Sequence, residues 1–147
     1  MSPSEIVRTF IEDKLNKKDL QGMLDMMSDD IHYQNMPLRA AVGKTEMMDF
    51  MRDMGEIDDM TLTIKNIAAT GRVVFLERSD SWTMNGVKVV EPFVGVFEVN
   101  DDGKICRWSD YFDLRSWESA NQHPPAFFAK WARADYKHYY ENRLGSP

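Results

Sequence analysis

"FLERSDSW", residues 75–82, begins like a buried strand and then places three charged residues, Glu77, Arg78 and Asp80, in its middle. The side chains of a strand alternate between the two faces of a sheet. The more apolar face of this segment carries Val74, Leu76, Arg78, Asp80 and Trp82. A charge that leaves water needs an oppositely charged, hydrogen-bonded partner. The alternation therefore predicts a strand whose inward face carries an ion pair between Arg78 and Asp80.

This strand belongs to a predicted antiparallel meander in the second half of the chain. Strand-like alternation covers residues 61–69, 72–82, 88–99 and 104–114. The turns between these segments, "ATGR", "MNGV" and "NDDGK", each contain the glycine that is typical of hairpins. The sequence therefore predicts four consecutive antiparallel strands.

The first half of the chain is mainly helical in its pattern. Ser2 and Glu5 have the spacing of a capping box, and Asp19 and Thr45 are expected to cap two further helices. The inward residues of these two helices are expected to be Leu20, Met23, Leu24, Met27, Met47, Met48, Met51 and Met54. A short strand, "IHYQNM" at residues 31–36, is predicted between them, and Pro37 ends it or places it at an edge. Helices followed by antiparallel strands indicate an α+β fold with helices on one face of the sheet.

Two other predicted strands also place polar groups on their apolar faces. In "ICRWSDYFDL", residues 105–114, Asp110 shares its face with Cys106, Trp108, Phe112 and Leu114. In the strand at residues 31–36, Tyr33 and Asn35 lie on the face of Ile31, whereas His32 points the other way. The inward polar residues are thus Tyr33, Asn35, Arg78, Asp80 and Asp110. An arginine has five donors, which is enough to bridge two carboxylates.

This polar set has two interpretations. It can be a buried Asp–Arg–Asp network that only specifies the fold, and such networks also perturb pKa values. Alternatively, the two carboxylates have different roles, one protonated as an acid and one ionised as a base, because like charges close together do not both ionise easily. Tyr33 and Asn35 would then orient a water molecule. Side-chain alternation alone does not choose between the two.

Composition excludes several classes of protein. A length of 147 residues with 43% hydrophobic and 29% charged residues is typical of a globular domain. The net charge of −6 argues against a nucleic-acid surface. No run approaches the about 18 apolar residues of a membrane span. The N-terminus does not resemble a secretory signal and Cys106 is the only cysteine, so we expect a cytoplasmic protein.

Other candidate sites are weak. The histidines, His32, His123 and His138, lack metal-ligand spacing, and the glycines form neither a phosphate loop nor a dinucleotide fingerprint. We therefore expect no metal and no cofactor. Glu91 shares a face with Phe93, but "VEPFV" favours a position at the end of a strand.

The C-terminal segment has its own character. "AFFAKWARADYKHYYENR", residues 126–143, has roughly helical spacing of aromatic residues such as Phe128, Trp131, Tyr136 and Tyr139. We expect a single domain over residues 1–120 and an aromatic helical extension over residues 121–147. The extension is predicted to pack on the body or on a dimer mate; the alternatives are a lid over a pocket or a membrane-surface helix.

The chain resembles the limonene-1,2-epoxide hydrolase family, within the superfamily of ketosteroid isomerases and nuclear transport factor 2. The resemblance covers residues 5 to about 118 and is most specific in "YQNMPL" at 33–38, "ERSD" at 77–80, "GVFEV" at 95–99 and "GKICRWSDYFDLR" at 103–115. It implies a cone formed by a curved, mainly antiparallel sheet, with N-terminal helices over its concave face. It also implies Asp110 as the base, Asp80 as the acid and Arg78 as the bridge between them. Tyr33 and Asn35 would position water.

The resemblance further implies an activity. The chain would add water to a lipophilic epoxide, of terpene, fatty-acid or steroid type, to give a vicinal diol without a cofactor, and it would form a homodimer. The alternatives are an isomerase or cyclase of the ketosteroid-isomerase or polyketide-cyclase type, and a non-catalytic module that binds lipophilic molecules.

Overall fold

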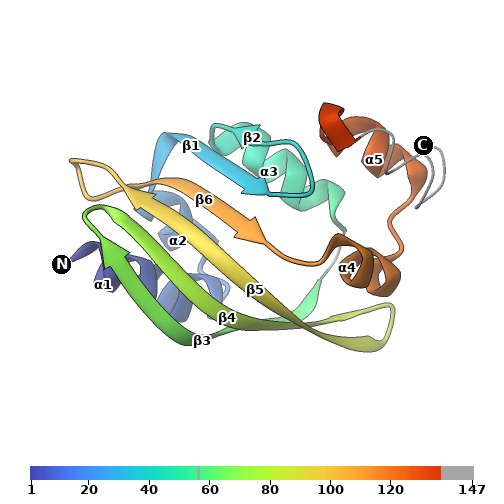
Figure 1. Cartoon of the computed structure of the whole chain (residues 1–147), viewed down its shortest axis with the longest axis horizontal. Coiled ribbons are helices and arrows are strands. Elements are labelled where there is room, and N and C mark those ends of the chain that lie inside the picture. Colours follow the sequence, from blue (N-terminus) through green and yellow to red (C-terminus); the bar gives the residue numbers. More distant parts are fainter. Residues whose placement is uncertain (56, 137–147) are drawn as a thin grey trace.

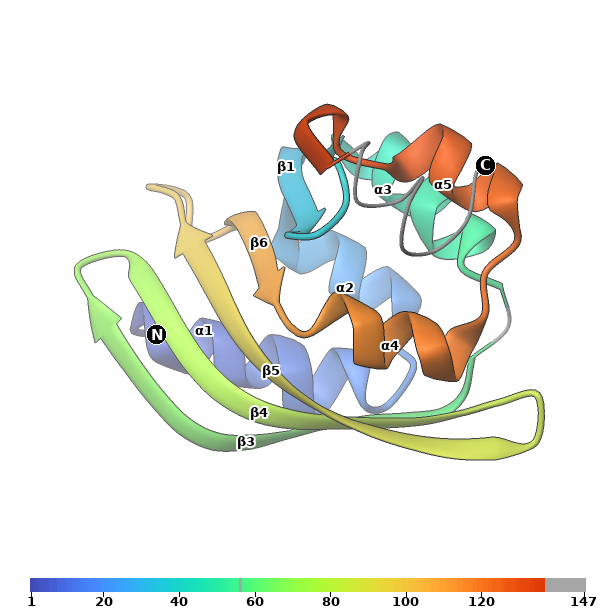
Figure 2. The ribbon, with the colours of Figure 1, turned by 45° about the vertical axis from the view of Figure 1, so that its right-hand side comes forward.

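A strongly curved sheet of six strands forms the frame of the protein (Figure 1). The computed structural model describes residues 1–55 and 57–136. The strands are β1 (Met27–Asn35), β2 (Ala41–Val42), β3 (Asp58–Thr70), β4 (Val73–Met84), β5 (Val87–Val99) and β6 (Ile105–Tyr111). Their order across the sheet is β2-β1-β6-β5-β4-β3, and every neighbouring pair is antiparallel except β1 and β6. Figure 2 shows how β3, β4 and β5 curve around α1.

The helices lie on the concave side and at one end of this sheet. They are α1 (Pro3–Thr9), which continues as a π-helical segment (Phe10–Leu15), α2 (Leu20–Met26), α3 (Lys44–Asp53), α4 (Leu114–Asn121), α5 (Pro125–Trp131) and a 3-10 turn (Ala134–Tyr136). The predicted α+β class, with a curved sheet and N-terminal helices over its concave face, is therefore confirmed. In the described part of the chain, no helix is long and apolar enough to cross a membrane.

Two of the predicted helix starts are confirmed and one is wrong. Ser2 and Glu5 form a capping box, and the Asp19 carboxylate accepts a hydrogen bond from the Gly22 amide. The third helix is not capped by Thr45. It begins at Lys44, and its cap position is Gly43, which has a φ of +88°. Glycine adopts this conformation at little cost. The Gly43 amide donates to the carbonyl of Ile31, so the helix start is fixed by β1 rather than by a side-chain cap.

Four other sequence expectations fail locally. Leu20, expected to face inward, is 48% exposed, and Met27 begins β1 instead of continuing α2. The last strand ends at Tyr111 rather than residue 114, because Asp113 caps α4 through the Ser116 amide. Glu91 is not at a strand end but is buried in the middle of β5.

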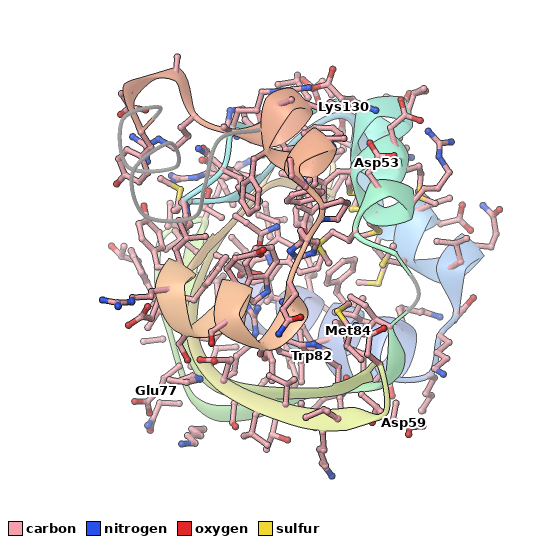
Figure 3. All side chains as sticks on the ribbon, turned by 90° about the vertical axis from the view of Figure 1, so that its right-hand side faces the viewer. Asp53, Asp59, Glu77, Trp82, Met84 and Lys130 are labelled. Atoms are coloured by element: carbon pink, nitrogen blue, oxygen red, sulfur yellow. The ribbon has the colours of Figure 1, made fainter. Side chains whose placement is uncertain are left out.

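The C-terminal segment packs on the body of the protein. Trp131 is fully buried, contacts Phe50 of α3 at 4.9 Å between ring centroids, and donates to Asp53 Oδ2 at 2.9 Å. Lys130 Nζ lies 2.6 Å from the same carboxylate, and Figure 3 shows the side chains of Lys130 and Asp53 together. At Ala132 the backbone becomes extended, so the expected continuous helix is interrupted within residues 126–136.

The remainder of the extension cannot be compared with its prediction. Tyr139 and His138 lie outside the described residues. No described residue of α5 lines the cavity presented below. The division into residues 1–120 and 121–147 stays a prediction.

Candidate active site

Burial along β4 follows the alternation of its side chains. Val74, Leu76, Arg78, Asp80, Trp82 and Met84 are buried, whereas the residues between them are exposed or half-buried. The side chains of Arg78 and Asp80 are only 1% and 7% exposed. The strand thus has one buried face, which carries Arg78 and Asp80, whereas Glu77 is exposed on the other face.

Arg78 bridges two carboxylates. Its Nε and Nη2 donate to the two oxygens of Asp80 at 2.8 and 2.9 Å. Its Nη1 and Nη2 donate to the two oxygens of Asp110, on β6, at 2.8 and 2.7 Å. Paired, bidentate contacts of this kind are the strong form of the arginine–carboxylate interaction, and they fix the relative orientation of the two acids.

The two water-positioning candidates lie next to Asp110. β1 runs parallel to β6, with Tyr33 in register with Trp108 and Asn35 in register with Asp110. Asn35 Nδ2 donates to the Tyr33 hydroxyl at 3.1 Å, and the rings of Tyr33 and Trp108 lie 4.8 Å apart. The parallel pairing of β1 with β6 therefore brings Tyr33 and Asn35 beside Asp110, and the Arg78 bridge adds Asp80, so all five predicted residues form one buried cluster.

The electrostatic environments of these groups differ. Burial raises the pKa of Asp80 to about 6, and the nearby Asp110 acts in the same direction against the lowering effect of Arg78. Burial opposes the charge of Arg78, but the two carboxylates outweigh it and raise its pKa. Burial, together with the charge of Asp110, raises the pKa of Tyr33 well above its ordinary value. Tyr33 therefore remains a protonated donor at neutral pH.

The structure adds two residues that the sequence did not identify as part of the site. Trp108 Nε1 donates to Asp110 Oδ1 at 2.9 Å, so Asp110 accepts from both Trp108 and Arg78. Gly95, on β5, leaves space for the guanidinium: a Cβ at this position would lie 2.6 Å from Arg78 Nη1. Trp108 could have been found from its shared face with Asp110, whereas the role of Gly95 depends on a contact between different strands.

The cluster opens into a cavity of about 380 Å³. The five polar residues line one part of it, and much of the remaining wall is apolar and rich in methionine. The apolar lining residues include Leu15, Met23, Met51, Met54, Ile57, Met60, Leu62, Phe93 and Trp117. This volume lies at the small end of the range of about 300–1,000 Å³ for small-molecule sites. The arrangement suits a lipophilic molecule with one reactive polar group.

The other titratable candidates lie apart from this cavity. His32 is exposed, as its position in the strand predicted. His123 is buried against Glu118 at 2.6 Å, and its Nε2 has no hydrogen-bond partner among the described residues. Glu91 accepts a hydrogen bond from the Ser116 hydroxyl and is not a lining residue. In the part of the chain that the structure describes, no group of three or more His, Cys, Asp or Glu side chains could hold a metal ion.

Known proteins of similar sequence and structure carry related chemistry. Epoxide hydrolase EphG of Mycobacterium tuberculosis is 32% identical over 100 residues, which cover 68% of this chain and 66% of that protein, slightly less than two thirds of its length. The solved structure of an M. tuberculosis LEH-like epoxide hydrolase has a TM-score of 0.69 and 28% identity, covering 82% of this chain and 90% of that one.

A second solved structure shares the fold alone. SalBIII, an epoxide hydrolase/cyclase-like enzyme of pyran ring formation in the polyether salinomycin, has a TM-score of 0.69 at 16% identity and covers 78% of this chain and 92% of its own. The limonene-1,2-epoxide hydrolase catalytic domain, by contrast, matches residues 1–122 of this sequence. The resemblance seen in the sequence is thus confirmed, and the chain belongs to the limonene-1,2-epoxide hydrolase family.

Proposed function

We propose that the protein is a cofactor-independent epoxide hydrolase that converts a lipophilic epoxide into a vicinal diol. The observation that carries this proposal is the bridge from Arg78 to two buried carboxylates, Asp80 and Asp110, at the wall of a largely apolar cavity. Epoxide opening needs a proton donor on the oxygen and an activated nucleophile at the carbon. A fixed pair of carboxylates with different protonation states supplies both.

In the proposed step, Asp110 removes a proton from a water molecule held by Tyr33 and Asn35. The water oxygen forms a bond to one epoxide carbon while the bond from that carbon to the ring oxygen breaks. Asp80 gives its proton to the ring oxygen, which becomes the second hydroxyl. Water and epoxide are both consumed, and one proton has moved from Asp80 to the product and one from water to Asp110. Return of a proton from Asp110 to Asp80 restores the starting state.

The assignment of acid and base rests on the environments of the two groups. The pKa of Asp80, raised to about 6, keeps a share of this carboxyl protonated near neutral pH, as an acid requires. Asp110 accepts hydrogen bonds from Trp108 and Arg78, and such donors stabilise a carboxylate in its charged form. Asp110 is also the carboxylate in register with Asn35. We therefore assign Asp80 as the acid and Asp110 as the base.

Two other functions use the same fold. An isomerase or cyclase would move a proton beside a carbonyl, and such sites commonly pair a base with neutral donors rather than with an arginine-bridged acid. The bridge through Arg78 therefore favours hydrolysis. A non-catalytic binding module would need the apolar cavity but not the polar cluster.

The decisive experiment is an assay of diol formation from terpene, styrene, fatty-acid and steroid epoxides. Turnover is expected for at least one of them, and Asp80→Asn and Asp110→Asn should each remove most of it, since each positioned proton-transfer group contributes about 10²–10⁴-fold. Both amide variants should remain folded. Tight binding of apolar ligands with no turnover of any epoxide would favour the binding module instead.

The route through water can be tested separately. A single turnover in ¹⁸O-labelled water should place the label in the diol and none in the protein. Direct attack by a carboxylate would leave an ester that a second base must hydrolyse. Label in the side chain of Asp80 or Asp110 would contradict the mechanism without contradicting the reaction.

We also propose that the functional unit is a homodimer formed through the convex face of the sheet. Phe75, Val90, Val94 and Tyr111 are each more than 40% exposed on this face, opposite the helices. Val94 is in register with Tyr111, and Phe75 lies on the same face of β4, where Glu77 is in register with Val94. Exposed apolar side chains gathered on one face of a sheet are a feature of interaction surfaces.

A further inference from the structure

The cavity wall has a second polar region besides the catalytic cluster. The lining residues include Lys14, Lys18 and Asp19, which belong to the end of the first helical segment and the turn that leads into α2. The carboxylates and the arginine of the cluster are nearly completely buried, whereas Lys18 is exposed and Lys14 is half-buried. The two polar regions therefore mark the bottom of the cavity and its opening, with apolar residues between them.

Of these three residues at the opening, Lys18 is available to bind an anion. The Asp19 carboxylate is occupied: it accepts from the Gly22 amide at 2.9 Å and from Lys14 Nζ at 3.2 Å. Lys18 makes no ion pair with any described residue. Among the described residues that line the opening, Lys18 is therefore a cation with no ion-pair partner.

The backbone at Lys18 gives a second reason to consider this residue. Its φ is +58°, in the left-handed region that favours glycine. A residue with a Cβ adopts this conformation at a cost of about 1–2 kcal/mol. Unfavourable backbone conformations that persist in a structure cluster at functional sites. Here the left-handed residue caps the end of the helical segment: the Lys18 amide donates to the Leu15 carbonyl and the Asp19 amide to the Lys14 carbonyl. This turn places Lys18 among the lining residues of the cavity.

We propose that the natural substrate is an epoxide with an apolar chain that ends in a carboxylate, and that Lys18 binds this carboxylate at the opening. This inference rests on the proposed function. The epoxide would lie at the bottom against Asp80 and Asp110, the chain along the methionine-rich wall, and the carboxylate at Lys18. A cavity of about 380 Å³ suits a chain of medium length with the epoxide far from the carboxylate. The carboxylate takes no part in the reaction and is unchanged in the diol.

The test compares two epoxides that differ only in charge: a medium-length straight-chain acid with a terminal epoxide, and its methyl ester. The wild-type protein should have the higher kcat/KM on the acid. Exposed ion pairs contribute about 0.2–1 kcal/mol, so Lys18→Gln should lower kcat/KM on the acid by about 1.4- to 5-fold and leave the ester unaffected. Charge reversal in Lys18→Glu should have a larger effect, and added salt should reduce the preference for the acid.

Lys17 provides the matched control. It is the neighbouring residue, is exposed, pairs with Asp13 at 2.9 Å, and is not a lining residue of the cavity. Lys17→Gln and Lys17→Glu change the net charge by the same amounts as the Lys18 variants and should leave kcat/KM on both epoxides unchanged. An equal effect of the Lys17 and Lys18 variants would show that only the overall charge matters and would overturn the proposal.

Calorimetric titration with the saturated acid of the same length, and with its methyl ester, tests the inference without catalysis. The acid should bind more tightly than the ester to the wild-type protein, and Lys18→Glu should remove the difference. Equal binding of acid and ester to the wild type would contradict the role of Lys18, even if both epoxides are hydrolysed. Preferential binding of the acid without turnover of any epoxide would contradict the proposed hydrolase and leave the anion site supported.

Discussion

Asp80 is the residue at which the proposed chemistry depends most on pH. Its pKa is raised from 3.8 to about 6, and the acid role requires the protonated form. We therefore expect kcat/KM to fall as the pH rises through about 6, which a pH–rate profile on any substrate found in the epoxide assay would measure. A kcat/KM that stays constant between pH 5 and pH 8 would contradict the assignment of Asp80 as the acid.

The same shift predicts an effect on stability. A carboxyl whose pKa is higher in the folded than in the unfolded state contributes stability that is fully present below pH 3.8 and is lost as the pH rises through about 6. Asp80→Asn removes this titration. Urea unfolding at several pH values should therefore show that the variant gains stability relative to the wild type between about pH 4 and pH 7.

Gly95 is a position at which the site leaves no room for a side chain. An added Cβ would lie 2.6 Å from Arg78 Nη1 and 3.2 Å from Asp110 Oδ1, so Gly95→Ala must displace the bridging guanidinium. Misplacement of catalytic groups by about 1 Å can cost about 10²-fold, and we expect a loss of kcat of at least about tenfold with the fold retained. Val94→Ala, at the exposed neighbouring position, is the control and should keep its activity in the same assay.

The sequence predicts those site residues that can be recognised from the pattern of a single strand. Arg78, Asp80 and Asp110 were identified because a charge on an apolar strand face is a local pattern, readable with a period of two. Gly95 could not be identified in this way, since its role depends on the distance between β5 and a side chain of β4. The pKa values of Arg78 and Asp80 likewise depend on burial and on the neighbouring charges in three dimensions, which the order of residues does not specify.

At the scale of elements, α5 stabilises α3 from outside the part of the chain that matches the family. Trp131 contacts Phe50, donates to Asp53, and lies under the guanidinium of Arg39 at 4.1 Å. Truncation of a buried tryptophan typically costs about 3–5 kcal/mol. We therefore expect Trp131→Ala to lower the free energy of unfolding by this amount, which denaturant titration would measure.

Lys130→Ala serves as the control for that prediction. It removes the other partner of Asp53 from a side chain that is 48% exposed, and exposed ion pairs are worth about 1 kcal/mol or less. A similar loss in both variants would assign the stabilisation to charge rather than to aromatic packing. Because Phe50 also contacts Tyr33 at 5.5 Å, the aromatic packing of α5 extends to the site itself.

The ends of helices and strands could be predicted where a local side chain determines them. The predictions were wrong where a tertiary contact determines them. The caps at Ser2 and Asp19 are local hydrogen bonds within one turn. The start of α3 instead follows from the Gly43 amide bonding to β1, a contact that no local pattern contains. At the end of β6, Asp113 fits either a strand or a helix cap, and the start of α4 decides for the cap.

At the scale of the whole molecule, the convex face of the sheet is the surface on which assembly depends. Helices cover the concave face (Figure 2). The opposite face exposes Phe75, Val90, Val94 and Tyr111. Burial of such a patch by a second copy would remove this apolar surface from water. The site itself lies on the concave side, so a dimer of this kind leaves the cavity open in both copies.

The homodimer is tested by placing a charge at the centre of the patch. Val94→Lys would bury an unpaired ammonium group between two sheets, which strongly disfavours association. We expect the wild-type chain of 17.1 kDa to sediment at twice this mass in analytical ultracentrifugation and the variant to sediment as a monomer. Val87→Lys is the control, because Val87 is 61% exposed but lies at the end of β5 with the side-chain alternation of the concave face. A monomeric wild type, or dissociation of both variants, would contradict assembly through this face.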